Sequence, residues 1–466
     1  MTHRLARLRE ALGTIVTTDP ATLEAHRHDY WMLAQMMDLH DRPSPAPLAV
    51  VRPESTEQVS RTLVACRDLG LPVIPFGGAS GVCGAIEASP ESVVLSTRSL
   101  EGLVALDDDD LRASFRAGTM GPDAERIVQE RGLTIGHWPQ SIDLSTVGGW
   151  VATRASGQYS SAYGNIEDLL LGLEAVLPDG SVLRTSETPR ASAGPDLRQL
   201  MLGSEGTLGV ITEVTFSLRP LPEASVGQAF HFADIFAGFD PIRRFMRDGW
   251  RPPVIRLYDA PESARHFEGQ CPPGRAALIL LHEGPRSQVD LQISEVAKIC
   301  AAAGGVEMSD ESVGRWLEHR NRVPTFTELL SNGLVVDTIE VGAPWSRVGA
   351  LYDAVTQSLR EVPSVRAATG HSSHSYRSGT NLYFTFVARP DDKAQMADVY
   401  RECWTRTMQA TLATGCGIAH HHGIGRVRRD FLASEIGETG IGLLRAVKGA
   451  LDPQGLLNPG ALLPPQ

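Results

Sequence analysis

Three segments rich in glycine and small hydroxyl residues lie in the first half of this 466-residue chain, and they restrict its fold more than any other feature. They are residues 75–84 (PFGGASGVCG), residues 139–168 and residues 203–211 (GSEGTLGVI). Glycine lets backbone N–H groups approach an anion without obstruction by a Cβ atom. One such loop is more often a plain tight turn, but three in one domain favour a site for an extended, phosphate-bearing cofactor.

The spacing of these glycines argues against two common nucleotide-binding motifs. Residues 75–84 fit neither the GxGxxG pattern of a dinucleotide-binding fold nor a phosphate loop that ends in Lys followed by Ser or Thr. A nicotinamide-binding Rossmann domain is therefore not supported.

Charge and cysteine usage narrow the class of protein further. The chain has 43 Lys and Arg residues against 55 Asp and Glu residues, a net charge of −12, which argues against nucleic acid as a partner. Its six cysteines form no CxxC pair, which is typical of a reducing compartment. The first residues do not resemble a secretory signal, and no apolar run reaches the roughly 18 residues of a membrane span. We therefore expect a cytoplasmic protein without a transmembrane segment; peripheral contact with a membrane and a homodimer stay open.

The chain is long enough for two hydrophobic cores. Residues 55–69 carry an amphipathic helical pattern closed by Gly70, between two short apolar strands, and residues 178–180 (PDG) indicate a hairpin turn. Prolines punctuate residues 218–223 (LRPLPE), after which aromatic residues become more frequent. These features divide the chain into an N-terminal helical segment (1–45), a cofactor domain (46–220), a second domain (221–435) and a C-terminal tail (436–466) that packs back on the cofactor domain.

Four motifs, PFGGASG, STVGGWVATRASG, YGNIEDL and GSEGTLGVITEV, together resemble the FAD-binding domain of the vanillyl-alcohol oxidase type flavoproteins. Within that family the chain is most similar to the alkyldihydroxyacetonephosphate (alkylglycerone-phosphate) synthases, through GHWP (136–139), IRL (255–257), APW (343–345), YF (383–384) and HHHGIG (420–425). The resemblance implies a two-domain α+β fold. Residues 46–220 would bind FAD, and residues 221–435 would form an antiparallel-sheet cap that shields the flavin.

The resemblance also assigns the residues that hold FAD. Some family members bind flavin covalently through a histidine in or near the first loop, and residues 75–84 contain none, so we expect non-covalent FAD. The cofactor-binding residues are expected to be Pro75, Gly77, Gly78, Ala79, Ser80 and Gly81 at the pyrophosphate, Pro139, Ser141, Thr146, Gly149, Ser156 and Gly157 along the cofactor, and Glu205, Gly206 and Ile211 on the adenine side.

Four residues are candidates for proton chemistry. His420, His421 and His422 are consecutive, so at most two of them can face one site, because side chains alternate along a strand and diverge around a helix. In the synthases that the chain resembles, these histidines lie over the flavin, bind substrate and shuttle protons, for which neutral imidazole is suited; a surface triplet is the alternative. Tyr383 matches a synthase tyrosine that exchanges a proton with the substrate, and a core tyrosine is the alternative.

Arg256 is a candidate for substrate binding, and His137 is a further candidate for catalysis. Arg256 lies inside an apolar strand-like run and needs a partner, either a phosphate or carboxylate ligand or a buried acidic side chain. His137 matches an active-site histidine of the family, and a turn histidine satisfied by the backbone is the alternative. No motif for a second substrate arginine is found at residues 322–332.

The sequence predicts no metal site. Related FAD-linked D-2-hydroxyacid dehydrogenases carry His-x-Gly-Asp-Gly-Asn-x-His, in which two histidines hold a divalent ion. The corresponding residues 370–383 contain no Asp, and Tyr383 stands where the second histidine would fall.

Two reactions follow from the resemblance. The first replaces the acyl group of an acyl-dihydroxyacetone-phosphate-like substrate by a fatty alcohol, as in ether-lipid synthesis, without net oxidation. The alternative is FAD-linked oxidation of a 2-hydroxyacid or another small hydroxylated substrate. A non-catalytic flavin-binding protein is disfavoured by the presence of Tyr383 and the histidine triplet. The expected partner is a small-molecule or lipid substrate.

Overall fold

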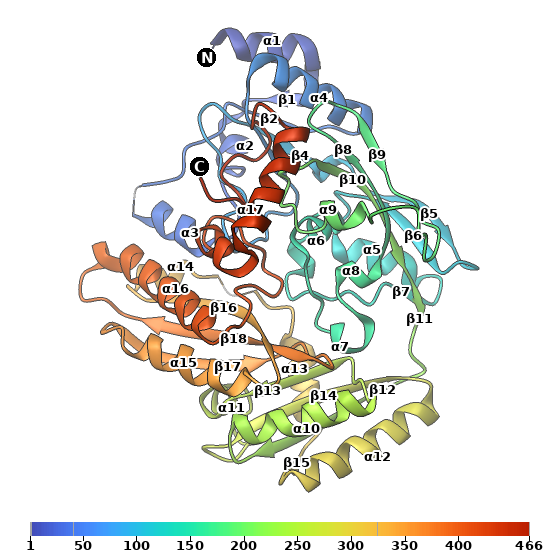
Figure 1. Ribbon diagram of the computed structural model, residues 1–466, viewed down its shortest axis with the longest axis vertical. Helices are drawn as coiled ribbons and strands as arrows, with labels where there is room; N and C mark the ends of the chain where they lie inside the picture. Colours follow the sequence, from blue (N-terminus) through green and yellow to red (C-terminus); the bar gives the residue numbers. More distant parts are fainter. Residues whose placement is uncertain (1, 41, 324, 466) are drawn as a thin grey trace.

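The computed structural model describes residues 2–40, 42–323 and 325–465 and has two lobes (Figure 1). Residues 1, 41, 324 and 466, which belong to the expected N-terminal segment, cap and tail, lie outside the described residues. Among the helices that are described, none is both long enough and apolar enough to cross a membrane.

The first lobe opens with the strand–helix–strand unit that the sequence pattern predicts. Helix α4 (Thr56–Leu69) begins after Ser55, whose side chain accepts the backbone N–H of Gln58, and ends at Gly70 in the left-handed conformation (φ 60°). It connects β2 (Ala49–Val51) to β3 (Val73–Phe76), and both strands pair in parallel with β4 (Val93–Ser96). Strand β3 therefore ends inside the first glycine-rich segment.

The N-terminal segment joins both lobes. It comprises α1 (Thr2–Leu12), β1 (Val16–Thr17), α2 (Pro20–Glu24) and α3 (Met32–Leu39). Strand β1 extends the first sheet, whose order is β1-β2-β4-β3. Met32, Leu33 and Met36 of α3 instead belong to the hydrophobic core of the second lobe. The segment is thus partly buried against the cap.

A second sheet completes the first lobe. Its order is β5-β6-β10-β8-β9, and all its pairs are antiparallel. The hairpin predicted at residues 178–180 is confirmed, because β8 and β9 pair across it. The strands of this sheet are β5 (Leu103–Asp107), β6 (Arg112–Arg116), β8 (Leu170–Val176), β9 (Val182–Arg184) and β10 (Val210–Ser217). A separate small pair is formed by β7 (Leu133–Thr134) and β11 (Arg219–Pro220). The helices of this part are α5 (Gly121–Gln129), α6 (Val147–Thr153), α7 (Ser160–Tyr163), α8 (Ile166–Leu169) and α9 (Arg198–Met201).

The second lobe is a seven-stranded antiparallel sheet, in the order β15-β12-β14-β13-β17-β18-β16. Its strands are β12 (Ala224–Phe232), β13 (Val254–Tyr258), β14 (Ala276–Gly284), β15 (Val306–Met308), β16 (Val335–Pro344), β17 (Val365–Ser372) and β18 (Gly379–Ala388). The accompanying helices are α10 (Ile235–Asp248), α11 (Ala260–His266), α12 (Arg286–Ala302), α13 (Glu311–His319), α14 (Thr327–Ser331), α15 (Val348–Arg360) and α16 (Met396–Ala413). The expected α+β fold with an antiparallel-sheet cap is confirmed.

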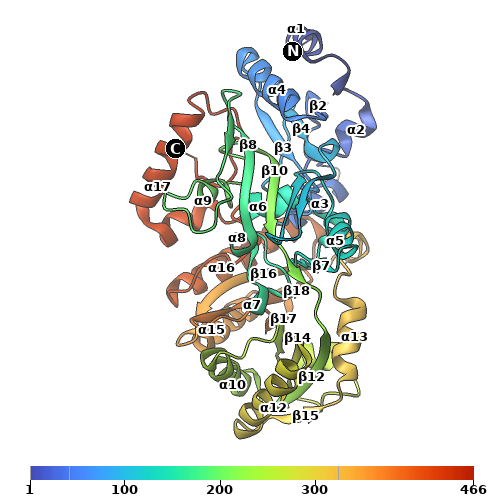
Figure 2. The same cartoon turned by 90° about the vertical axis from the view of Figure 1, so that its right-hand side faces the viewer.

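The end of the chain returns to the first lobe. Helix α17 (Leu432–Leu451) lies alongside that lobe in both views (Figures 1 and 2), and Val447 and Leu451 pack on its core. Beyond the helix, the backbone N–H of Asn458 donates to the carbonyl of Val73, 2.8 Å away. The boundary expected at residue 435 falls inside α17, beside the non-helical Gly437 (φ 76°).

Candidate active site

A cavity of about 1100 Å³ is lined by residues of both lobes. The first lobe contributes the three glycine-rich segments, and the cap contributes residues of β13, β16, β17 and β18. Its volume is slightly above the usual range for ligand pockets, about 300–1,000 Å³. The cavity can therefore hold a large cofactor together with a substrate.

The structure brings almost all the expected cofactor-binding residues to this cavity. The lining residues among them are Pro75, Gly77, Gly78, Ala79, Ser80, Gly81, Pro139, Ser141, Thr146, Gly149, Ser156, Glu205, Gly206 and Ile211. Gly157 is not among the lining residues: a Cβ atom there would lie 2.8 Å from the backbone nitrogen of Trp138, so this glycine is required by packing inside the lobe.

The three glycine-rich segments pack directly on one another. A Cβ atom on Gly78 would collide with the carbonyl oxygen of Leu144 in the second segment. A Cβ atom on Gly206 (φ 71°) of the third segment would lie 2.9 Å from Pro75 in the first. Close backbone packing thus explains glycine at these positions, and it leaves backbone N–H groups, serines and threonines at the cavity wall.

Glu205 links the third segment to the loop that carries the histidine triplet. Its carboxylate accepts the backbone N–H groups of Ile424 (2.6 Å) and Gly425 (2.8 Å). Burial raises the pKa of Glu205 to about 7, against the opposing effect of these two N–H donors. This contact could not be predicted from local sequence patterns, because the two segments lie more than 200 residues apart in the chain.

The three histidines of the triplet differ in whether they line the cavity, although all three are partly exposed. His421 and His422 line the cavity and His420 is not among the lining residues, in agreement with the prediction that at most two can face one site. The Tyr383 hydroxyl, also at the cavity, lies 2.6 Å from Nε2 of His421. Burial lowers the pKa of His421 well below its usual value and that of His422 to about 3, and it raises the pKa of Tyr383. Neutral imidazoles therefore face a neutral phenol.

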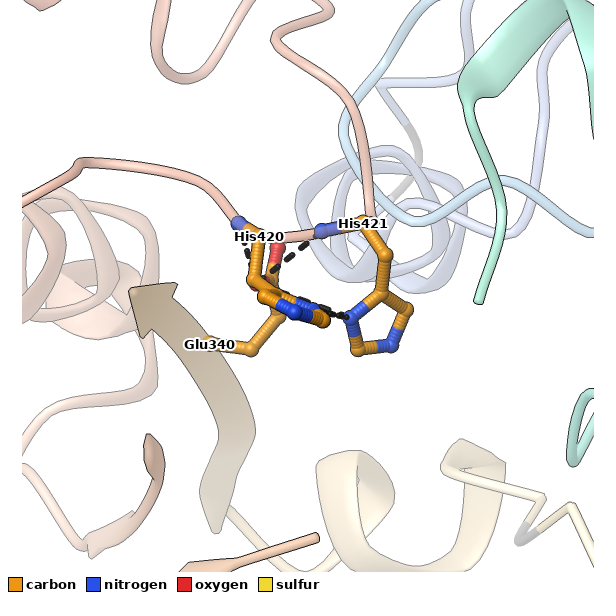
Figure 3. A group of neighbouring side chains, drawn as sticks. All are labelled: Glu340, His420 and His421. Atoms are coloured by element: carbon orange, nitrogen blue, oxygen red, sulfur yellow. Dashed lines mark hydrogen bonds and ion pairs between the residues drawn. The ribbon is translucent and has the colours of Figure 1, made fainter. Parts of the chain in front are cut away.

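Glu340, a fully buried residue of β16, holds the triplet loop in place (Figure 3). Its carboxylate accepts the backbone N–H groups of His420 (2.6 Å), His421 (3.2 Å) and His422 (3.0 Å), and it pairs with the buried Arg428 at 3.0 Å. Atoms of Glu340, His420 and His421 lie within 4.8 Å of one another, a spacing that a metal ion could use. Both carboxylate oxygens already accept hydrogen bonds, so we interpret Glu340 as an anchor for the loop.

Two histidines of the lost metal motif line the cavity and were not selected by the sequence analysis. His374 Nδ1 lies 2.6 Å from the Ser160 hydroxyl, and His371 Nδ1 lies 2.7 Å from the buried carboxylate of Glu262. The pattern that could have indicated a site role for His371 and His374 is their spacing of three residues within residues 370–375.

Arg256 lies at the cavity, as expected of a substrate residue. One guanidinium nitrogen lies 3.3 Å from Nε2 of His371, and the group packs over Trp316, 5.3 Å from its ring centre. Its buried Nε makes no hydrogen bond within the described structure. Arg315, Arg320 and Arg322 line the same cavity, so its cap side is cationic although the chain is acidic overall.

The structure does not bring His137 to the cavity. Its side chain is fully buried in the first lobe and packs on Trp150, with the ring centres 4.7 Å apart. Neither ring nitrogen makes a hydrogen bond in the described structure, and burial lowers its pKa to about 3. The structure therefore places His137 in the core of the first lobe, and the alternative of a histidine satisfied by the backbone does not hold; its catalytic role stays a prediction.

Known proteins give an independent view of the chain. Residues 47–186 match the FAD binding domain family, and residues 221–462 match the C-terminal domain of FAD linked oxidases. An uncharacterized FAD-linked oxidoreductase of Escherichia coli K12, YgcU, is 34% identical over 98% of this chain and 97% of its own length. An alkyldihydroxyacetonephosphate synthase of Caenorhabditis elegans is 28% identical over 90% of this chain and 76% of its own length.

The solved structures agree on the fold. An alkyldihydroxyacetonephosphate synthase superposes with a TM-score of 0.81 at 23% identity, over 98% of this chain and 84% of that chain. The resemblance to vanillyl-alcohol oxidase type flavoproteins is thus confirmed. The cavity also fits the cofactor of these proteins, because three converging loops of small residues offer backbone N–H groups and hydroxyls along one wall. The chain therefore belongs to the FAD-linked oxidase family, and FAD is its cofactor.

Proposed function

We propose that this protein is a FAD-dependent enzyme of the alkyldihydroxyacetonephosphate synthase type, which exchanges the acyl group of an acyl-dihydroxyacetone-phosphate-like substrate for a fatty alcohol. The observation that carries the proposal is the 2.6 Å contact between the Tyr383 hydroxyl and Nε2 of His421, at a cavity that the FAD-binding segments also line. When bound, FAD supplies a ring system that accepts electrons from a substrate carbon.

Tyr383 and His421 are suited to move a proton to and from the substrate. Both are neutral at pH 7, because burial raises the pKa of the phenol and lowers that of the imidazole. Their short hydrogen bond lets the imidazole take the phenolic proton as the tyrosine oxygen takes one from the substrate, so the phenol stays neutral and the transferred proton passes to His421.

The remaining walls of the cavity match the two ends of such a substrate. The guanidinium of Arg256, with its unpaired Nε, is suited to bind a phosphate. Apolar side chains that could surround an acyl or alkyl chain line other parts of the cavity: Met32, Val82, Ile86, Val323, Phe326 and Leu329.

The second candidate is oxidation of a 2-hydroxyacid or another small hydroxylated substrate. The 34% identity to a protein named as a FAD-linked oxidoreductase favours it. Arg256 would then bind a carboxylate, and His421 with Tyr383 would accept the hydroxyl proton. The same residues would serve both reactions, so only an experiment can distinguish between them.

The test supplies the FAD-loaded enzyme with acyl-dihydroxyacetone phosphate and a long-chain alcohol whose hydroxyl carries ¹⁸O. The proposal expects free fatty acid and an ether product that retains the heavy oxygen, both measured by mass spectrometry. Release of fatty acid without ether product would contradict the proposal, as would complete inactivity on these substrates combined with flavin bleaching by a 2-hydroxyacid. The second outcome would establish the oxidoreductase.

A further inference from the structure

A continuous chain of hydrogen bonds leads from Tyr383 away from the cavity. Nε2 of His421 lies 2.6 Å from the Tyr383 hydroxyl, and Nδ1 of the same ring lies 2.8 Å from Nδ1 of His420. Nε2 of His420 lies 2.8 Å from the hydroxyl of Tyr376. Four side chains are therefore joined by three short contacts, and the last two, His420 and Tyr376, are not among the cavity-lining residues.

The contact between the two Nδ1 atoms fixes how protons are distributed along this chain. A neutral imidazole carries one N–H, so one Nδ1 must donate and the other must accept. If His421 Nδ1 donates, then its Nε2 accepts from Tyr383, and His420 donates from Nε2 to Tyr376. If His420 Nδ1 donates, every hydrogen bond is reversed. His420 and His421 must thus be opposite tautomers, and the chain has two settings.

Moving one proton across each of the three hydrogen bonds converts one setting into the other. As Tyr383 takes a proton from the substrate, it gives its own to His421 Nε2, His421 gives Nδ1–H to His420, and His420 gives Nε2–H to the Tyr376 oxygen. Tyr376 then releases its original hydroxyl proton to water. One proton enters, one leaves, and each imidazole ends neutral.

The surroundings favour this route over storage of the proton on His421. The nearby Glu340 oxygens are already occupied by three backbone N–H groups and Arg428. Burial opposes a cation on His421 more strongly than the carboxylate of Glu340 favours one, and burial together with the charge of Arg428 opposes a cation on His422. Tyr376 and the neighbouring Asn165 are partly exposed. The Tyr376 hydroxyl accepts from the Asn165 amide nitrogen at 2.9 Å and directs its own proton to the Asn165 amide oxygen at 3.2 Å, on the side away from His420.

We propose that Tyr376 and His420 form the outer half of a proton relay that connects Tyr383 to solvent at the contact between the two lobes. The inference rests on the proposed role of Tyr383 and His421, and it adds a function for the histidine that does not reach the cavity. Tyr376 and His420 are relay residues that act through His421 and do not touch the substrate.

The kinetic test is Tyr376→Phe in the FAD-loaded enzyme, assayed with whichever substrate wild type turns over. We expect kcat to fall by roughly 10²-fold, the scale of a lost proton-transfer group, with bound FAD and Tm close to wild type. At fixed pH and ionic strength, added imidazole should restore the rate progressively, because a small proton carrier can replace the lost hydroxyl. Wild type should not respond. An unchanged kcat, or a lowered kcat that imidazole does not restore, would overturn the relay.

A second measurement needs no substrate and therefore separates the relay from the proposed function. In holoenzyme labelled with ¹⁵N at histidine, NMR of the ring nitrogens should show His420 and His421 as neutral and opposite tautomers, one protonated at Nδ1 and the other at Nε2. Identical tautomers, or a doubly protonated ring at pH 7, would overturn the relay even if the enzyme proves to be a synthase. Opposite tautomers in a protein without synthase activity would leave the relay standing and reject the proposed function.

Discussion

Tyr383 sits in β18 among core residues, yet its hydroxyl faces the cavity and contacts His421 at 2.6 Å. Replacing it with Phe keeps the ring and the strand but removes the proton. We expect kcat per bound FAD to fall by about 10²-fold or more, with little change in Tm or FAD content. The matched control is Tyr352→Phe, which removes a buried hydrogen bond to Asp259 (2.8 Å) away from the cavity. The Tyr352→Phe variant should have a lower Tm and an unchanged kcat. A lower Tm with an unchanged kcat in Tyr383→Phe would instead make Tyr383 a core residue.

Glu340 is the residue on which the histidine loop depends. Glu340→Gln leaves Arg428 buried without its counter-charge, so the free energy of unfolding should fall by about 3–5 kcal/mol in urea denaturation. Glu361→Gln, which weakens an exposed pair with Arg406, should cost less than about 1 kcal/mol. Equal effects of the two variants would show that the buried pair does not hold the loop.

The same pair gives the protein an acid-sensitive component of stability. Burial alone would raise the pKa of Glu340, but the charge of Arg428 and the backbone N–H of His422 bring it below its usual value of 4.5. Its native carboxylate binds a proton less readily than in the unfolded chain, so the stabilisation is complete above about pH 4.5 and is lost as the pH falls below it.

The sequence predicts the positions of some site residues and not of others. Tyr383, Arg256, His421 and His422 could be placed at the cavity because their motifs resemble a known family. The burial of His137 against Trp150 could not be predicted, since it is a tertiary contact with no local signal. Glu340 was missed for the same reason: a lone glutamate in an apolar strand shows its role only when Arg428 and the triplet loop fold over it.

Among the helices and strands, α4 and the β8–β9 hairpin could be predicted from local sequence patterns. Ser55, Gly70 and residues 178–180 determine the backbone only within a few residues of their own positions. The order of the seven cap strands was not predictable, because it pairs β12 with β15 and β16 with β18 across long stretches of chain. The glycine-rich segments were predictable only in part. Their role at a cofactor site was predicted from the sequence, but their packing on one another was not.

That packing makes Gly78→Ala a sharp test of the first loop. The added methyl group would collide with the Leu144 carbonyl, so we expect a loss of about 1–3 kcal/mol of stability together with weaker FAD binding. Gly449→Ala, in the exposed part of α17 with open space around its Cβ position, should leave FAD binding unchanged and raise stability by up to about 1 kcal/mol. Normal stability and FAD content in the Gly78 variant would contradict the packing described here.

For the whole molecule, the two lobes enclose the cofactor site through contacts between groups distant in sequence, such as Glu205 with the loop at Ile424. The first glycine-rich loop, residues 75–84, holds no histidine for a flavin bond. We therefore expect acid precipitation to release all FAD into the supernatant. Flavin that stays with the pelleted protein would point to a covalent bond elsewhere in the site.

The reaction proposed for this cavity is acyl-for-alkoxy exchange without net oxidation. The most direct measurement counts fatty acid released per enzyme-bound FAD under strict anaerobiosis, with acyl-dihydroxyacetone phosphate and a fatty alcohol and with no electron acceptor. We expect many turnovers per FAD while the absorbance of oxidised flavin returns to its starting value. A reaction that stops at one equivalent with bleached flavin, and resumes only when an electron acceptor is added, would contradict it.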